Sequence, residues 1–148
     1  MIEQTIENWH KCIRGQLEGG LDAILHDDCV FYSPVVFTPQ RGKELTKMYL
    51  NAAGATFGGD EPTKTAGLSS ATSGSDENGF RYVKEVMSGN HAVLEFETQM
   101  DGKYVNGIDM ITCDDDGKIV EFKVMIRPLQ AINLLHQKMA AMLAQMKS

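Results

Sequence analysis

The sequence predicts an α+β fold, a cone made of a strongly curved antiparallel sheet with helices packed on its concave face. Residues 92–100, 105–113 and 118–127 are three consecutive segments of strand character, separated by turn residues. The first half of the chain instead has helical periodicity around one short strand. Helices segregated to one face of such a sheet are typical of the α+β class. The length of 148 residues suits a single domain, 1–148, with a sizeable core.

The chain opens with an amphipathic helix, predicted over residues 2–17. We expect Glu18-Gly19-Gly20 to end it. Trp9, the only tryptophan, lies on the apolar side of this helix. Its indole can serve as core packing or as one wall of a ligand pocket. The apolar residues that recur at helical spacing are Ile2, Ile6, Trp9, Ile13 and Leu17.

The next predicted elements are a short helix over residues 21–25, which residues 26–28 close, and a strand over 29–33 that Pro34 stops. Residues 34–42 form a loop in which Phe37 could either roof a cavity or simply pack. A third helix is predicted over 43–55, with Tyr49 among its inward residues.

The segment 58–79 differs from the rest in composition, being rich in Gly, Ser, Thr and Asp. We interpret it as a long, mobile loop, which could close over the mouth of a pocket or be a functionless surface insertion. A strand over 80–87 follows it and leads into the three-stranded meander. Pro128 stops the last strand, and a final helix is predicted over 129–146 with a stripe of methionines.

The turns of the meander predict how its strands pair. A two-residue turn at 101–102 would place Leu94 opposite Asp109. A four-residue turn at 114–117 would place Phe122 opposite the same carboxylate. Because side chains alternate between the two faces of a sheet, Asp109 then falls in the middle of the apolar face. We expect that face to hold Leu94, Phe96, Thr98, Val105, Gly107, Ile111, Val120, Phe122, Val124 and Ile126.

A buried carboxylate without a partner is costly, and it escapes the cost by taking up a proton. We therefore expect desolvation to raise the pKa of Asp109 above its usual value of about 3.9. A protonated acid in an apolar hollow is a good hydrogen-bond donor. Alternatively, Asp109 is ionised and a backbone or side-chain donor meets it in a structural role.

Composition excludes several classes of function. The net charge of −6, without a basic run, argues against nucleic acid as a partner. The N-terminal residues show no signal peptide, and no segment has the roughly 20 apolar residues of a membrane span. Three widely spaced cysteines fit free thiols in a reducing cytoplasm. The four histidines are scattered, so we expect neither a metal nor another cofactor.

Several short motifs spread over the chain resemble one family. They are residues 27–34 (DDCVFYSP), Arg41-Gly42 before a helix, Gly107-Ile108-Asp109, and residues 116–121 (DGKIVE). In order and spacing they resemble the SnoaL-like branch of the nuclear-transport-factor-2-like superfamily, which polyketide cyclases and ketosteroid isomerases share. The resemblance implies the cone fold, but this fold hosts enzymes, binding proteins and dimerisation modules.

The resemblance to ketosteroid isomerases also implies which positions of this chain correspond to that family's catalytic residues. Asp109 falls where that family has its oxyanion-hole aspartic acid, Trp9 where it has the oxyanion-hole tyrosine, and Ser33 where it has the general-base aspartate. Serine has no useful basicity unaided, and proton abstraction next to a carbonyl needs a base. Steroid isomerase activity is therefore not expected. The Asp-Arg-Asp arrangement of the epoxide-hydrolase branch is not found either, since Arg127 falls on the face opposite Asp109.

Three functional hypotheses follow. The first is a protein that binds a small hydrophobic molecule around Asp109. The second is an isomerase, cyclase or hydrolase that uses Asp109 as an acid or hydrogen-bond donor. The third is an interaction module without a ligand. In all three we expect a homodimer, through the C-terminal helix or through the outer sheet face, where Ile108, Met110 and Met125 lie. The ligand-binding residues predicted with Asp109 are Trp9, Ser33, Phe37, Tyr49, Phe96 and Phe122.

Overall fold

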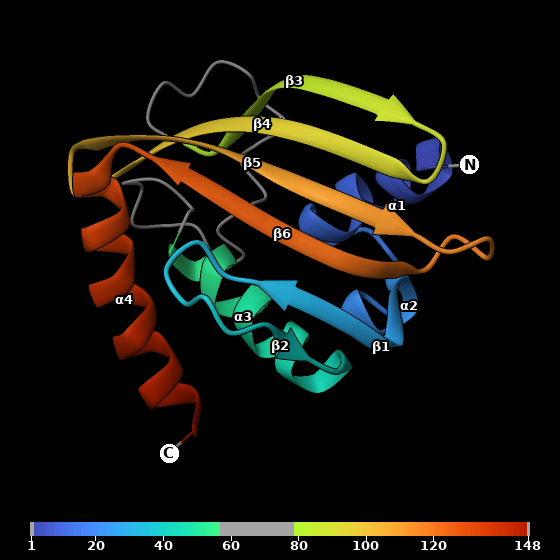
Figure 1. The fold of residues 1–148 in the computed structure, drawn as a ribbon, viewed down its shortest axis with the longest axis horizontal. Helices are drawn as coiled ribbons and strands as arrows, with labels where there is room; N and C mark the ends of the chain where they lie inside the picture. The colour runs from blue at the N-terminus through green and yellow to red at the C-terminus, as the bar shows by residue number, and fades with distance from the viewer. Residues whose placement is uncertain (1, 57–78, 148) are drawn as a thin grey trace.

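A computed structural model describes residues 2–56 and 79–147 of the protein, and it shows the predicted mixture of helices and a single curved sheet (Figure 1). The predicted loop at 58–79 lies outside the described residues, apart from Gly79. In chain order the elements are α1 (Ile2–Ile13), α2 (Leu21–Ile24), β1 (Leu25–Tyr32), β2 (Gln40–Arg41), α3 (Lys43–Thr56), β3 (Arg81–Ser88), β4 (His91–Met100), β5 (Lys103–Cys113), β6 (Ile119–Arg127) and α4 (Leu129–Lys147).

The six strands form one sheet in the order β2-β1-β6-β5-β4-β3. Neighbouring strands are antiparallel except β1 and β6, which are parallel. The parallel pair joins the first long strand to the last one, so the sheet brings the two halves of the chain together. This pairing departs from the fully antiparallel sheet of the prediction, while the α+β class is as predicted.

The first helix is shorter than predicted. It ends at Ile13, because Gly15 adopts a left-handed backbone with φ of 72°. The amide of Gly15 donates to the carbonyl of Cys12, and the amide of Gln16 donates to the carbonyl of Lys11. This is the Schellman arrangement, which terminates a helix at a glycine. The prediction that Glu18-Gly19-Gly20 ends the helix is therefore wrong, as is the prediction that residues 26–28 close the second helix, since they belong to β1.

In the meander, the pairing of β4 with β5 has the predicted register, whereas the pairing of β5 with β6 is shifted. Leu94 lies opposite Asp109, as the two-residue turn predicts. On the other side Val124, not Phe122, lies opposite Asp109. An irregularity near Val120 places Ile119 on the inner face, so the expected inward position of Val120 is wrong. The main shift is two residues, and an even shift keeps every other side chain on its predicted face.

The physical cause begins in the turn between β5 and β6. The backbone of Asp114 pairs with Lys118, because the Asp114 amide donates to the Lys118 carbonyl over 2.9 Å. The Asp114 side chain also accepts hydrogen bonds from the amides of Asp116 and Lys118. Lys118 therefore pairs with Asp114, whereas the predicted four-residue loop would pair it with Cys113. This difference shifts the register by one residue. The irregularity near Val120 adds the second residue of the shift.

The core fills the concave side of the sheet. Helix α1 contacts β3, β4 and β5, whereas α3 contacts β1, and α4 contacts α3 and the end of β6. In Figure 1 these helices lie on one side of the sheet or at the strand ends. Buried aromatic rings join the layers: Trp9 of α1 meets Phe122 of β6 with ring centroids 5.0 Å apart.

Candidate functional site

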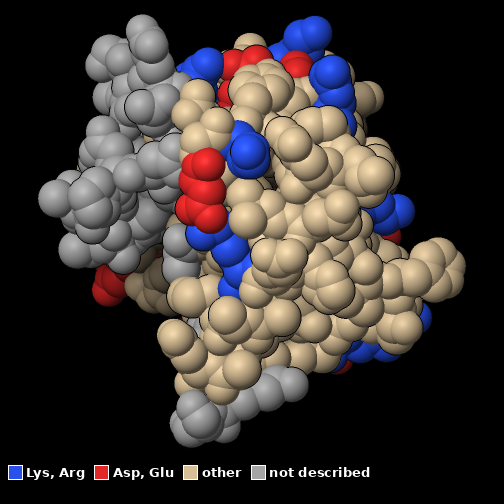
Figure 2. Space-filling model, turned by 90° about the vertical axis from the view of Figure 1, so that its left-hand side faces the viewer, with Lys and Arg blue, Asp and Glu red and all other residues tan. Residues whose placement is uncertain are grey.

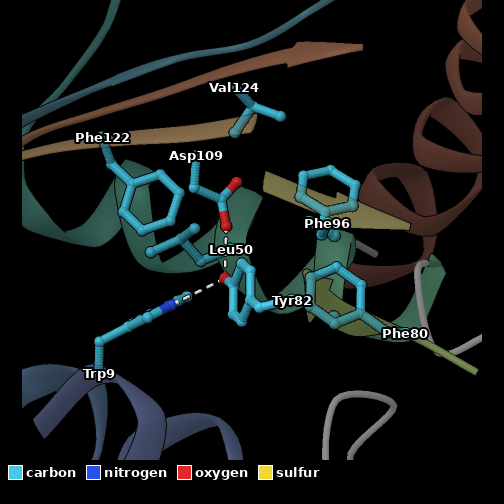
Figure 3. Close-up of a pocket in the computed structure, with 10 residues that line it drawn as sticks. Trp9, Leu50, Phe80, Tyr82, Phe96, Asp109, Phe122 and Val124 are labelled. Atoms are coloured by element: carbon cyan, nitrogen blue, oxygen red, sulfur yellow. Dashed lines mark hydrogen bonds between the residues drawn. The ribbon is translucent and has the colours of Figure 1, made fainter. Parts of the chain in front are cut away.

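Asp109 lies in the middle of β5 and points into the concave side of the sheet, where it is only 6% exposed. It lines a small hollow between the sheet, α1 and α3 (Figure 3). The other side chains around this hollow are apolar, apart from a tyrosine hydroxyl and an indole N–H. The residues that line it with Asp109 are Trp9, Leu50, Ala53, Gly54, Phe80, Tyr82, Phe96, Phe122 and Val124.

A chain of hydrogen bonds from two other elements reaches Asp109. The Trp9 indole Nε1 donates to the Tyr82 hydroxyl over 2.9 Å. The Tyr82 hydroxyl in turn donates to Asp109 Oδ2 over 2.5 Å. Figure 3 shows the three side chains linked in this order, with Tyr82 between the other two. A carboxyl on β5 is thus connected to α1 through a tyrosine on β3.

A bulge in the edge strand aims Tyr82 at this site. Along β3, Tyr82 pairs with Phe96, but Lys84 pairs with Glu95, so Val83 is the extra residue. Downstream of the bulge Glu85 pairs with Leu94 and shares its concave side. If side chains alternated regularly between the two faces of β3, an inward Glu85 would make Tyr82 point outward. The extra residue shifts the alternation by one, so Tyr82 points inward.

The burial of Asp109 decides its protonation. Desolvation is the larger effect and raises the pKa of Asp109 from 3.8 to about 7, while the hydrogen bond from Tyr82 acts in the opposite direction. Desolvation also raises the pKa of Tyr82 well above its ordinary value, and the Asp109 charge adds to this. The tyrosine therefore stays neutral, and the carboxyl changes its protonation near neutral pH. The predicted upward shift of the Asp109 pKa is confirmed.

The second carboxyl oxygen of Asp109 is available for another partner. Among the described residues, Asp109 makes one hydrogen bond, to Tyr82 through Oδ2, and no ion pair. A protonated carboxyl can donate one hydrogen bond and accept others. The site can therefore present a donor at low pH, or a carboxylate acceptor at high pH, to a molecule in the hollow.

The hollow is small in this structure. It holds about 350 Å³ of empty space when the solvent at its mouth is counted, and the centre of a water molecule can reach about 30 Å³ of it. About 10–15 Å³ of such space is enough for one water molecule. The hollow thus accommodates a water or two as it stands, and a larger molecule requires the lining side chains to move.

The structure brings four of the predicted site residues to this hollow. Asp109, Trp9, Phe96 and Phe122 all line it. Tyr49 does not line it and instead stacks on Phe31 with ring centroids 5.3 Å apart.

Ser33 and Phe37 lie elsewhere, by a separate open groove next to β6. The Ser33 hydroxyl accepts hydrogen bonds from the amides of Val35 and Val36 and so stabilises the turn after β1. Phe37 is 99% exposed and does not roof the hollow. The structure thus separates these two residues from Asp109.

Sequence reasoning missed the residue that contacts Asp109 directly. Tyr82 follows Phe80 at a spacing of two residues, and this pattern in a strand could have pointed to an aromatic inner face. The bulge at Val83 interrupts the alternation and hides the signal. Leu50, Ala53 and Gly54 were also missed, because they lie at helical spacing that looks like ordinary core.

Two features are absent from the described parts of the chain, a cluster of metal-ligating side chains and a helix able to span a membrane. Among residues 2–56 and 79–147 there is no group of three His, Cys, Asp or Glu side chains placed to hold a metal ion. Within the same residues no helix is both long and apolar enough to cross a membrane. Cys12, Cys29 and Cys113 are all free thiols.

The fold and the buried acid define a class of cone-shaped α+β proteins, and comparison with solved structures identifies the family. A steroid delta-isomerase from Pseudomonas aeruginosa is 32% identical, with a TM-score of 0.79, over 97% of this chain and 92% of that one. The chain therefore belongs to the nuclear-transport-factor-2-like (NTF2-like) superfamily, to which the SnoaL-like proteins also belong.

More distant structures share the fold alone. An uncharacterised protein with a cystatin-like fold from Silicibacter pomeroyi is 24% identical over 93% of this chain and 83% of its own, with a TM-score of 0.72. An NTF2-like protein of unknown function from Mesorhizobium loti is 14% identical over 86% of this chain and 91% of its own, with a TM-score of 0.61. No family model matches the sequence, and no curated protein matches it either.

Proposed function

We propose that the protein binds a small, largely apolar molecule that carries one hydrogen-bonding oxygen, such as a carbonyl, beside Asp109. The observation that carries this proposal is the carboxyl itself, which is 6% exposed, lies among aromatic rings and has one oxygen unpartnered among the described residues. An apolar hollow with a few convergent polar groups is the usual form of a small-molecule site.

The neutral form of Asp109 is the one suited to a carbonyl ligand. Below its pKa of about 7 the carboxyl carries a proton, which it can donate to an acceptor in the hollow. Above this pKa the carboxylate would face the carbonyl oxygen with negative charge and repel it. We therefore expect affinity for a carbonyl compound to fall as the pH rises through about 7.

The ligand is expected to be mainly aromatic or alicyclic. Phe80 and Phe96 stack with ring centroids 4.8 Å apart, and Trp9 and Phe122 form the opposite wall (Figure 3). Rings of this kind favour flat or ring-shaped apolar molecules, because aromatic contacts add to the area that binding removes from water. Entry of such a ligand requires side chains such as Leu50 to move, since the space now accessible in the hollow holds only a water molecule or two.

A titration with apolar ketones, read by the fluorescence of Trp9, tests the proposal. Trp9 is the only tryptophan, and its indole is two hydrogen bonds away from Asp109, so a bound ketone should change its emission. Asp109→Leu, whose side chain offers no hydrogen-bond donor, should weaken binding at pH 6 by about tenfold, the loss of one hydrogen bond to a buried group. The matched control is Asp115→Leu in the exposed turn, which should leave affinity unchanged. Equal affinities for all three proteins, or no binding across the series, would count against the proposal.

A second candidate function is proton-transfer catalysis on an unsaturated ketone. It is favoured by the 32% identity to a protein described as a steroid delta-isomerase. It is also favoured by the Asp109 pKa of about 7, because an acid or base works best near the working pH. The described lining of the hollow contains no second carboxylate or imidazole, so Asp109 would have to act as both base and acid.

An absorbance assay separates the two functions. Movement of a double bond into conjugation with a ketone raises ultraviolet absorbance, so turnover of β,γ-unsaturated ketones can be followed directly. Turnover that Asp109→Asn abolishes would establish the enzyme. Binding without turnover in the same preparation would establish the binding protein.

A further inference from the structure

A ligand larger than water can enter the hollow beside Asp109 only if part of its wall moves, because the accessible space holds a water molecule or two. Tyr82 is the partly exposed aromatic residue of this wall. Among the described aromatic residues of the lining, it is therefore the one that stands between the hollow and solvent. The other aromatic side chains of the lining are at most 4% exposed: Trp9, Phe80, Phe96 and Phe122.

Tyr82 belongs to a strand that leaves its side chain room to turn. Figure 1 shows β3 at the edge of the sheet, where it pairs with β4 alone among the described strands. The bulge at Val83 follows Tyr82 directly and interrupts this pairing. The Tyr82 ring meets its neighbours edge to face, with ring centroids 5.1 Å from Phe80 and 5.4 Å from His10. A side chain in such a place can change its rotamer with less disturbance of the sheet than one on a central strand.

A pair of polar side chains holds the ring in place from the solvent side. His10 Nε2 of α1 lies 2.6 Å from Glu85 Oε2 of β3, and the His10 ring packs against Tyr82. These two side chains are 24% and 31% exposed, and pairs that solvent reaches in this way contribute little to stability. Opposite charges also lie together elsewhere on the surface, and Figure 2 shows acidic and basic side chains gathered in a strip on the side of α4. The contact of His10 with Glu85 therefore opposes an outward turn of Tyr82 only weakly.

The other polar groups of the hollow converge on the Tyr82 hydroxyl. Trp9 Nε1 donates to this hydroxyl over 2.9 Å, and the hydroxyl donates to Asp109 Oδ2 over 2.5 Å. Figure 3 shows the indole and the carboxyl directed at this one oxygen. The other residues of the described lining have no polar side chains. The protein's own tyrosine thus occupies the best position for an oxygen in the hollow.

A ligand oxygen in this position would have the same two partners. The Trp9 N–H would donate to it, as it donates to the tyrosine. The neutral Asp109 carboxyl would donate to it as well, since its proton can sit on Oδ2 once the tyrosine no longer donates there. Beside Oδ1 alone, a ligand oxygen would have one partner in the described lining, the carboxyl itself. Because two donors stabilise an acceptor better than one, the ligand's oxygen and the Tyr82 hydroxyl compete for one position.

We propose that Tyr82 is an internal ligand that keeps this site closed: its hydroxyl holds the place of the ligand's oxygen between Trp9 and Asp109, and it must turn outward before a ligand binds. This role of Tyr82 rests on the proposed function, since it concerns how the same ketone reaches Asp109. The apparent affinity is then the affinity of the open form multiplied by the fraction of molecules in which Tyr82 has turned outward. Variants that release the tyrosine should bind ketones more tightly.

Ketone titrations of Tyr82→Phe test this role. The variant keeps the ring but has no hydroxyl bonds for a ligand to break, so it should bind apolar ketones about tenfold more tightly than the wild type. At pH 5 Asp109, with its pKa of about 7, is neutral, so protonation does not distinguish the proteins. Tyr104→Phe serves as the control, because it also removes a hydroxyl that donates to a carboxylate, that of Glu97 over 2.9 Å, but away from the hollow. Its ketone affinity should equal that of the wild type.

The indole N–H of Trp9 reports the hydrogen bonds directly. Trp9 is the only tryptophan, so a nitrogen-15 NMR spectrum contains a single indole signal. In Tyr82→Phe the proton signal should move upfield, because the N–H has lost its acceptor. A bound ketone should return the signal close to its wild-type position, since its oxygen then lies where the hydroxyl was. A ketone that bound beside Oδ1 alone would leave the signal of the variant upfield.

The tyrosine side chain as a free molecule, p-cresol, tests the oxygen position without any ketone. Tyr82→Ala leaves a space of this shape, and p-cresol should bind there and restore the wild-type indole signal. Toluene, which has the same ring without the hydroxyl, should not restore it. Circular dichroism checks that each variant is folded.

The outcomes separate this role of Tyr82 from the proposed function. Tighter ketone binding by Tyr82→Phe, with the return of its indole signal, would support the internal ligand. Equal or weaker binding by Tyr82→Phe, or an indole signal that a bound ketone does not move, would overturn it and leave the proposed function standing. If no ketone binds to any of these proteins, the proposed function fails. In that case p-cresol decides whether Tyr82 fills an oxygen site, and an indole signal that p-cresol does not restore would overturn this as well.

Discussion

The replacement Asp109→Asn should make the protein more stable at alkaline pH. Wild-type Asp109 has an ordinary pKa of 3.8 when unfolded and a pKa of about 7 when folded, because burial disfavours its charge. Between these two values the folded state binds more protons than the unfolded state, so stability is lost as pH rises through this window. Asparagine is neutral at every pH, and its side-chain oxygen can still accept the hydrogen bond from Tyr82.

The size of the effect follows from the two pKa values. The shift from 3.8 to about 7 corresponds to roughly 4 kcal/mol when it is fully expressed, above pH 7. Between pH 5 and pH 8, the same values give a loss of roughly 2–3 kcal/mol in wild-type unfolding free energy that the asparagine variant does not share. This is a sizeable part of the 5–15 kcal/mol by which a domain is usually stable.

Urea denaturation at a series of pH values measures this difference. The unfolding free energy of the variant minus that of the wild type should rise between pH 5 and pH 8 and level off above it. Asp115→Asn, the same replacement in the exposed turn, should show no such rise. A difference that stays flat or falls with pH would refute the reasoning, because it would mean that burial does not raise the Asp109 pKa.

Two other substitutions test the contacts around the site. Tyr82→Phe removes the hydrogen bond that lowers the Asp109 pKa, so carbon NMR titration should place that pKa higher than in the wild type, and an unchanged or lower value would contradict the assignment. Gly107→Ala should destabilise the protein by about 2 kcal/mol or more, since its Cβ would lie 2.6 Å from Phe96 Cζ and 2.6 Å from the carbonyl oxygen of Met125. Gly15→Ala is the comparison, because nothing lies within 4 Å there and only its φ of 72° is strained, which costs about 1 kcal/mol. Equal thermal unfolding of the two alanine variants would exclude crowding at Gly107.

The parts of the fold that sequence predicted well are those that local chemistry determines. Asp101 and Gly102 have φ values of 51° and 76°, which is the two-residue turn that their sequence favours, and the Leu94–Asp109 register follows from it. The turn at 114–117 is less informative, since three consecutive aspartates and a glycine allow turns of several lengths. The face of Asp109 was nevertheless predicted correctly, because a register error of two residues preserves the side-chain alternation.

The parts that sequence did not predict depend on distant segments. The parallel pairing of β1 with β6 joins residues about 90 positions apart, and no local pattern encodes it. Tyr82 was missed for a related reason: the bulge at Val83 exists only because β3 pairs with β4, and the bulge decides which way Tyr82 points. The position of Ser33 also depends on its local turn, in which its hydroxyl binds two backbone amides instead of reaching the hollow.

The protonation of Asp109 depends on how firmly α1 is held against the sheet. The start of the helix is tied to the β3–β4 turn by the bond from the Ile2 amide to the Gly89 carbonyl, 3.1 Å long. Its middle is tied to the β5–β6 turn by the Thr5 hydroxyl, 2.9 Å from the Gly117 carbonyl. Further along, His10 lies 2.6 Å from Glu85. These contacts flank Trp9 and keep its indole hydrogen-bonded to the Tyr82 hydroxyl. A molecule that displaced α1 would therefore admit water to the hollow and lower the pKa of Asp109.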